Sequence, residues 1–368
     1  MVLKKSSVAI KLSVRPILRL LAATAAVAVT VALPLNWGQV ARALTLVAAG
    51  LRQPEQAAAV LGAHLTTETE PTVQIIQLPD KTNKSPTQKP QPTTPVYPTA
   101  LSITPPGADG SGGKIYEKKM TTGDTLLTGI ATLNRSGTSV DIAAALKRAL
   151  SQRWQQTDAP QVLLIHTHTT EGYMLYDAGY YNAADRARTK DEQRNVCAVG
   201  EAVKAALAAQ GITALHDTTI HDSPQYSGAY TRSAKTVQTY LKKYPTIQIV
   251  LDLHRDAIME GDSGLVKPTV TIDGRKAAQM MLIAGVVSTK NLPHKHWEQN
   301  LTLATRWQKA LTDAYPGIMR PLNTVASRYN QHLSPGYLLV EVGSEGNTLD
   351  EAVYSGYLLG KTLAELLR

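Results

Sequence analysis

Two histidines and a glutamate follow an apolar run in the sequence VLLIHTHTTEGY, residues 162–173. They are His166, His168 and Glu171, so three potential metal ligands fall within six residues. Imidazole and carboxylate ligands suit a catalytic zinc site, in which three protein ligands leave one position open for water. The motif therefore indicates metal-dependent hydrolysis, provided that other strands or loops of the domain complete the ligand set.

Two further apolar runs carry polar residues of the same kind. IVLDLHRDA brings His254, and LLVEVGSEGN brings Glu341. Ligands in open α/β sheets bind at the carboxyl ends of the strands, so these residues converge if the three strands are parallel neighbours. A carboxylate inside an apolar strand is costly to bury unless it is paired, metal-bound or catalytic. Glu341 is accordingly the candidate general base beside a metal-activated water.

Each residue also has a purely structural interpretation. A single histidine at a strand end is more often a hydrogen-bonded structural residue than a ligand, and His166 and His168 could mark no more than a turn. In DLHRDA, Arg255 could simply pair with Asp252 or Asp256. The metal site is favoured because the signals recur at three strand ends of one domain.

The segments that would position these residues alternate between strand and helix patterns. Short apolar runs predict strands, and longer runs with helical periodicity, one of them ended by Gly211, predict helices. This alternation predicts an α/β domain with a mostly parallel sheet flanked by helices. We expect strands at 161–166, 212–216, 247–254 and 337–343, and helices at 195–211, 228–245, 297–316 and 348–367.

The N-terminal part of the chain has a different composition. A basic segment, 1–19, precedes an apolar stretch at 20–37 that is long enough to cross a membrane, so we expect a transmembrane anchor with its basic flank in the cytoplasm. A cleaved signal peptide is the alternative, because ARA at 41–43 resembles a cleavage site. A juxtamembrane segment, 38–65, and a Pro/Thr-rich disordered linker, 66–113, follow.

The composition limits the classes of partner that this protein can have. The net charge of +9 and the pI near 9.4 suggest an anionic partner, such as nucleic acid, a membrane surface or the cell wall. No nucleic-acid-binding motif is recognisable, and such a partner conflicts with an exported domain. The single cysteine, Cys197, is expected to exclude both a disulfide framework and a thiolate zinc site within the chain.

Several long motifs also resemble a known family. HTHTTEGY, SPQYSGAYTRS, YPTIQIVLDLHRDAI and RYNQHLSPGYLLVEVGSEGNTLDEA are similar to the stage II sporulation protein P family, over roughly residues 114–368. The resemblance implies a zinc amidase-like fold of the phosphorylase/hydrolase-like type. It also implies a membrane-anchored, Zn²⁺-dependent peptidoglycan hydrolase of endospore formers.

The activity implied by the resemblance is that of an N-acetylmuramoyl-L-alanine amidase, with additional endopeptidase action on stem-peptide cross-links. The implied partners are peptidoglycan, the membrane through the N-terminal helix, and the sporulation proteins D and M during engulfment. The implied location is a single-pass cell-membrane protein whose catalytic domain is extracytoplasmic, in the intermembrane space of the sporangium.

The resemblance to zinc amidases also implies roles for individual residues. His254 matches the second histidine ligand, Glu341 matches the catalytic glutamate, and His168, with His166 as second choice, matches the first histidine. Arg255 would stabilise the developing oxyanion or anchor a stem-peptide carboxylate, although a structural ion pair is an equal alternative.

The carboxylate ligand departs from the amidase pattern. At the corresponding point this chain has DEQRN, which offers Glu192 near the position and Gln193 at it, so we prefer Glu171. His294 and His296 are spare candidates on a loop that we expect to face substrate. The alternative function is a non-catalytic, peptidoglycan-binding module that recruits or activates a partner hydrolase.

Overall fold

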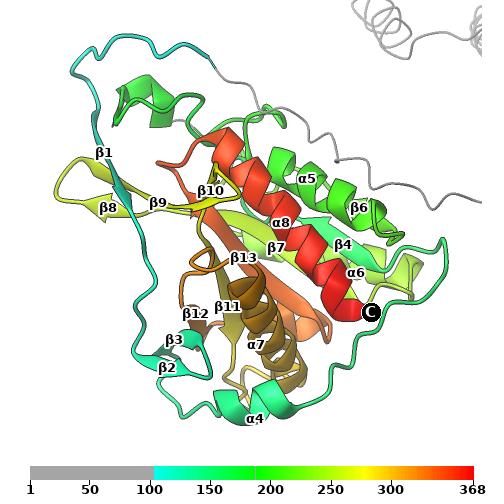
Figure 1. Cartoon of the computed structure of the whole chain (residues 1–368). Helices are drawn as coiled ribbons and strands as arrows, with labels where there is room; N and C mark the ends of the chain where they lie inside the picture. The colour runs from blue at the N-terminus through cyan, green and yellow to red at the C-terminus, as the bar shows by residue number, and fades with distance from the viewer. Residues whose placement is uncertain (1–102, 187) are drawn as a thin grey trace, which may run out of the picture. The chain divides into compact units, whose positions relative to one another are not determined.

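The computed structural model describes residues 103–186 and 188–368 (Figure 1). The expected anchor at 20–37, the juxtamembrane segment at 38–65 and most of the expected linker at 66–113 lie outside these residues. Within them, no helix combines the length and the apolar character that a membrane span requires. Residues 103–112, which fall in the expected linker, are described, and Ile103 N–H donates to the Leu175 carbonyl at 3.2 Å.

An eight-stranded mixed sheet forms the centre of the domain. Most neighbouring strands are parallel, and only the β2–β3 and β11–β13 pairs are antiparallel. The prediction of an α/β domain with a mostly parallel sheet is confirmed. In sheet order the strands are β2 (Thr125–Leu127), β3 (Ile130–Arg135), β12 (Leu322–Val325), β11 (Met280–Gly285), β13 (Tyr337–Ser344), β7 (Ile249–Asp256), β4 (Val162–Ile165) and β6 (Ala214–His216).

A second, smaller sheet borders the first (Figure 1). The sequence patterns did not predict it, because all of its strands except the long and mostly buried β9 are short or half-exposed. Its order is β10-β9-β1-β5, and β8 pairs with β9. The strands are β1 (Gly113–Lys118), β5 (Tyr180–Tyr181), β8 (Met259–Glu260), β9 (Gly264–Ile272) and β10 (Arg275–Ala278).

Helices cover both faces of the large sheet. The four long helices coincide with the predicted ones, and α5, α6 and α7 end just before Gly211, Pro245 and Pro316. The helices are α4 (Ile142–Lys147), α5 (Val196–Ala208), α6 (Ala229–Lys243), α7 (Trp297–Ala314) and α8 (Leu349–Leu367), with 3-10 turns at η1 (Ala183–Arg186) and η2 (Gln331–Leu333).

Alternate side chains of each strand pack against helices on opposite faces of the sheet. In β4, Val162 and Leu164 belong to the main core that α5, α7 and α8 complete, whereas Leu163 and Ile165 pack with Val237 of α6. Successive side chains of a strand point to opposite faces, so the sheet separates an α5 face from an α6 face. This separation decides where the polar residues after β4 point.

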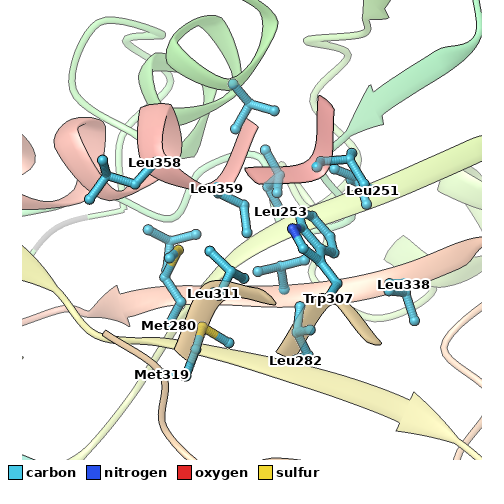
Figure 2. Packing of buried hydrophobic residues seen from close by; sticks show 14 of the residues in the cluster. Leu251, Leu253, Met280, Leu282, Trp307, Leu311, Met319, Leu338, Leu358 and Leu359 are labelled. Atoms are coloured by element: carbon cyan, nitrogen blue, oxygen red, sulfur yellow. The ribbon is translucent and has the colours of Figure 1, made fainter. Parts of the chain in front are cut away.

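The main core lies between the sheet and helices α7 and α8 (Figure 2). Trp307 of α7 is fully buried among leucines that include Leu253 of β7 and Leu338 of β13. Helices α5 and α8 approach each other closely, because a Cβ at Gly356 or Gly360 would lie within 3 Å of an α5 backbone oxygen. This packing holds the start of α5 against the sheet edge that carries the predicted site.

A buried lysine anchors the smaller sheet to α8. The ammonium of Lys267 lies 2.9 Å from Asp177 and 2.8 Å from Glu351, and it is almost completely buried. Lys276, which is half-exposed, contacts Asp177 at 3.1 Å and Glu117 at 2.7 Å. Burial acts to raise the pKa of Asp177, but Lys267 and Lys276 more than offset burial and lower the pKa.

We expect Asp177→Asn to remove an acid-sensitive part of the stability. A carboxylate whose folded pKa is depressed stabilises the fold above its unfolded pKa, and this contribution is lost as the pH falls through the folded pKa. The wild-type advantage over the variant should therefore be largest near neutral pH and shrink between about pH 5 and pH 2. Asp177 is half-exposed, so we expect about 1 kcal/mol.

Urea unfolding of both proteins across this pH range measures the difference. If the difference in free energy of unfolding between the two proteins stayed constant down to the lowest pH, the ionised carboxylate of Asp177 would contribute nothing to stability.

Candidate metal and catalytic site

The three strands that end in the predicted site residues are parallel neighbours in the order β13-β7-β4, which is the condition for these residues to converge (Figure 1). In the β7–β13 pair, Glu341 is in register with His254. Tyr337 of β13 and Val250 of β7 belong to the α6-side cluster, so strand alternation places Glu341 and His254 on the α6 face. The two residues therefore lie side by side.

A turn brings His168 to the same place. Strand β4 ends at Ile165, and residues 167–170 form a turn in which Glu171 N–H donates to the His168 carbonyl at 3.0 Å. The His168 ring is buried, with its centroid 5.3 Å from that of His254 and the two rings nearly perpendicular, at 81°. The chain thus gathers His168, Glu171, His254 and Glu341 at the carboxyl ends of the three strands.

His254 lies between two carboxylates. Its Nδ1 is 3.4 Å from Glu171 Oε2, and its Nε2 is 2.9 Å from Asp252 Oδ1, the latter being an ion-pair distance without an aligned hydrogen bond. Asp252 is itself held by the backbone N–H and the hydroxyl of Thr167, at 2.7 and 2.6 Å. A carboxylate behind a histidine is the usual support of a metal-ligating imidazole, which points Nδ1 toward Glu171.

The pKa values of these groups follow from their charges. Burial acts to raise the pKa of Glu171, but the hydrogen bond and charge of His254, together with Arg255, hold the pKa below its usual value. Burial acts to lower the pKa of His254, but Asp252 and Glu171 raise it well above normal. Glu171 and Asp252 thus favour positive charge on or next to the His254 ring.

Glu341 has the opposite shift. Burial raises its pKa to about 8; the His254 charge opposes this rise, whereas Asp256 and Glu171 add to it. Its Oε2 is buried and has no hydrogen-bond partner. A carboxylate with a pKa near neutrality beside His254 suits proton transfer at physiological pH.

The donor set fits a zinc ion in its chemistry. Two histidines and one carboxylate form the ligand set of known zinc hydrolases, and His168 Nδ1 is a buried nitrogen without a hydrogen-bond partner. The ligand atoms of His168, Glu171 and His254 do not all lie within 4.8 Å of one another. Among residues 103–186 and 188–368, that criterion is met by His166, Cys197 and His216.

His166 points away from the predicted site. Like Leu164 two residues earlier, its side chain lies on the α5 face, where Nε2 is 2.8 Å from His216 Nε2 and Nδ1 is 3.0 Å from the Leu253 carbonyl. The choice of His166 as an alternative ligand beside His168 therefore does not fit the geometry, because the strand ends and the turn reverses the direction of His168. The expectation that Cys197 cannot take part in a metal site does not fit this grouping either, because a mixed site needs only one thiolate.

Arg255 is buried, and its side chain pairs with neither Asp252 nor Asp256. Its Nε donates to the Gly172 carbonyl at 2.8 Å, and its guanidinium lies 3.6 Å from Glu345. The alternative pairing with Asp252 or Asp256 is wrong, because Asp252 faces His254 and Asp256 pairs with Arg320 at 2.8 Å.

The remaining candidates lie elsewhere. Glu192 and Gln193 are exposed on the loop before α5. His294 is completely buried, which is incompatible with its expected place on a substrate-facing loop, and burial lowers its pKa to about 4. His296 is the residue before the first turn of α7 and is half-buried. Of the carboxylates considered for the ligand, only Glu171 contacts His254.

Sequence reasoning missed several residues that surround His168. Tyr226 stacks on the His168 ring with a centroid distance of 4.3 Å, and Tyr230 of α6 meets it edge-on at 5.6 Å. Asp222, also missed, is buried and lies 4.0 Å from His168 Nδ1. Asp222 follows β6, the fourth parallel strand at this edge, so the rule that found the other strand ends would have drawn attention to it.

A cavity of about 550 Å³ adjoins the site. Its lining includes Arg188 and Arg255, and Arg188 also contacts Glu171 at 3.3 Å and Asp222 at 2.7 Å. The cavity therefore begins next to the predicted metal ligands, and its charged lining consists of two guanidinium groups and the carboxylate of Glu345.

Comparison with known proteins identifies the family. The sequence model of stage II sporulation protein P (SpoIIP) matches residues 70–364, which is most of the chain. The chain belongs to the stage II sporulation protein P family. The family member of that name from Bacillus subtilis is 29% identical over 205 residues, or 53% of this chain and 48% of that protein. The chain thus matches about half the length of this curated relative.

The solved structures that align with this chain resemble it only weakly. The N-acetylmuramyl-L-alanine amidase Ami1 of Mycobacterium smegmatis aligns over 58% of this chain and 99% of its own, with 12% identity and a TM-score of 0.34. The CwlD amidase of Clostridioides difficile, solved with the GerS lipoprotein, aligns over 56% of this chain and 99% of its own, with 11% identity and a TM-score of 0.32. Likenesses of this size support no conclusion about activity.

Proposed function

We propose that this chain is a zinc-dependent peptidoglycan hydrolase of spore formation, acting as an N-acetylmuramoyl-L-alanine amidase. The observation that carries the proposal is the convergence of His168, Glu171, His254 and Glu341 at the carboxyl ends of three parallel neighbouring strands. Membership of a sporulation family supports the biological setting.

In this proposal His168, Glu171 and His254 hold the ion. Zinc would lower the pKa of an attacking water toward neutrality and polarise the scissile carbonyl. Asp252 keeps His254 oriented through the 2.9 Å contact to Nε2. Glu341 takes a proton from the attacking water and returns it to the leaving amine, a task for which its pKa of about 8 is suitable.

The cavity beside the site suits the peptide part of the substrate. Stem peptides carry carboxylates, and Arg188 and Arg255 line the cavity next to the predicted ligands. We assign to Arg255 the anchoring of such a carboxylate, because its guanidinium is fixed by Gly172 and Glu345 and so needs no reorganisation on binding.

The proposal also covers the cellular setting, which rests on the sequence alone. It comprises a single-pass membrane anchor at 20–37, a catalytic domain outside the cytoplasm, and partnership with the sporulation proteins D and M. Fractionation of spore-forming cells tests the anchor, since a protein found entirely in the soluble fraction would contradict it.

Removal of the metal tests the reaction. We expect the purified full-length chain to release free stem peptides from peptidoglycan, as read by mass spectrometry of the products. A strong chelator should abolish release because the ion supplies both the activated water and carbonyl polarisation, and stoichiometric Zn²⁺ should restore it. If the zinc-loaded protein bound peptidoglycan but released nothing, the non-catalytic binding module would be the better description.

A further inference from the structure

A second cluster of metal-ligating side chains lies on the opposite face of the sheet from the predicted catalytic site. It consists of His166 after β4, His216 at the end of β6 and Cys197 in the first turn of α5. Their ligand atoms all lie within 4.8 Å of one another. The proposed hydrolysis uses none of these residues.

The hydrogen bonds of the two histidines fix their tautomers. His166 Nδ1 is 3.0 Å from the Leu253 carbonyl, which can only accept, so this nitrogen carries a hydrogen. His216 Nδ1 is 2.6 Å from a carboxylate oxygen of Glu201, so it is a donor as well. In neutral rings both Nε2 atoms are then bare, yet they face each other at 2.8 Å. Two bare nitrogens at this distance repel each other unless a proton or a metal ion lies between them.

The surroundings match those of a metal site. Metal-ligating histidines usually donate their other ring N–H to a carboxylate or a backbone carbonyl, and Glu201 and Leu253 supply one of each. Cys197 and Gly200 lie one turn apart on α5 and so face the same way. A Cβ at Gly200 would lie 2.4 Å from His216 Nε2 and 3.1 Å from His166 Nε2, so glycine alone leaves the nitrogens uncovered.

We propose that His166 Nε2, His216 Nε2 and Cys197 Sγ bind a soft divalent transition-metal ion, of which Zn²⁺ is the best match. A tetrahedral ion with Zn–N bonds of about 2.0 Å needs the two nitrogens to separate by only about 0.5 Å. Binding releases the thiol proton and any proton shared by the imidazoles to solvent. The ion ties the ends of β4 and β6 to the start of α5, and this site is distinct from the catalytic one.

The single cysteine provides a specific readout for this site. Co²⁺ replaces Zn²⁺ in such sites, and a cobalt-bound thiolate gives a near-ultraviolet charge-transfer band. Cys197 is the chain's only cysteine, so the band reports on this site alone. We would titrate Co²⁺ into the full-length chain and into His168→Gln/Glu171→Gln, which removes predicted catalytic ligands. We expect the band in both proteins, with saturation at one equivalent in the variant, where only this site remains.

Three variants test the ligand assignment. Cys197→Ser should lose the band, His216→Gln should weaken Co²⁺ binding at this site at least tenfold, and Gly200→Ala should do the same although every ligand remains. Native mass spectrometry should find two zinc ions in the wild type and one in Cys197→Ser. Peptidoglycan release, measured separately, decides the proposed hydrolysis, so the two proposals can fail independently.

Two results would contradict the proposed site at His166, His216 and Cys197. If the wild-type chain, with a native circular dichroism spectrum, gives no charge-transfer band at saturating Co²⁺, the two histidines share a proton and the proposal is wrong. A band that survives unchanged in both His216→Gln and Gly200→Ala would also overturn it, because the cobalt would then be bound to Cys197 by other ligands.

Discussion

Glu341→Gln is expected to slow stem-peptide release by a factor of about 10² to 10⁴, the usual contribution of general acid–base catalysis. Glutamine keeps the size and shape of the side chain but cannot accept a proton from water. The effect should fall on the catalytic rate rather than on substrate binding. Mass spectrometry of released peptides over time measures the rate, with both proteins loaded with zinc.

The same substitution should leave the fold and the metal intact. Burial raises the pKa of Glu341 to about 8, so the fold gains nothing from its ionised form, and the neutral amide should not lower the melting temperature. Zinc content should also stay at the wild-type value because Glu341 is not a proposed ligand. Glu365→Gln, the same change on the exposed surface of α8, is the matched control.

An unchanged rate in Glu341→Gln would show that another group takes the proton. If the rate and the zinc content fell together, Glu341 would be better described as a ligand than as a base.

The part of the fold that surrounds the site was predictable because its signals are strong and local. The apolar runs that became β4, β7 and β13 are buried almost throughout, and each is followed or interrupted by polar residues. Once parallel neighbours are assumed, the carboxyl-end rule brings His168, Glu171, His254 and Glu341 together without further information.

The rest of the sheet was not predictable in the same way. Strand β11 is a fully buried apolar run, but nothing local shows that it pairs antiparallel with β13. The smaller sheet joins β1 to β9, which are far apart in the sequence, through a parallel pairing. Pairings of this kind depend on long-range contacts that single-segment patterns do not encode.

The two histidines of HTH show how sensitive side-chain direction is to where a strand ends. Extended backbone beyond Ile165 would have put His166 and His168 on one face. The turn at 167–170 instead leaves His166 on the α5 face and carries His168 to the α6 face. His216 could have been noticed, because it ends the neighbouring strand β6, but no sequence pattern indicates that Cys197 and Gly200 would lie against it.

The segment that follows Glu171 is held in place by the buried lysine of the smaller sheet. Met174 N–H donates to the Asn347 carbonyl, and Leu349 N–H donates to the Met174 carbonyl, which fixes this segment beside the start of α8. Lys267 then joins Asp177 of the same segment to Glu351 of α8. The ammonium group of Lys267 thus adds an electrostatic tether to the backbone hydrogen bonds that hold the segment after the proposed ligand Glu171.

Lys267→Met is therefore expected to destabilise the chain by about 3–5 kcal/mol, the cost of leaving a buried charge without its partner. Methionine has a similar length and flexibility, so the loss is electrostatic rather than a cavity effect. Glu351 cannot move to solvent, because its carboxylate also accepts from Thr348 N–H at 3.0 Å and from Asn347 at 2.9 Å. Urea unfolding at neutral pH measures the change.

Lys276→Met is the matched control, since Lys276 contacts Asp177 and Glu117 but is half-exposed, and exposed ion pairs contribute about 1 kcal/mol or less. Adding Glu351→Gln to Lys267→Met should recover part of the stability, because the uncompensated charge disappears. Equal losses for the two lysines would contradict this account and would mean that water reaches Glu351. A large loss at Lys267 alone would show that the tether beside Glu171 is electrostatic.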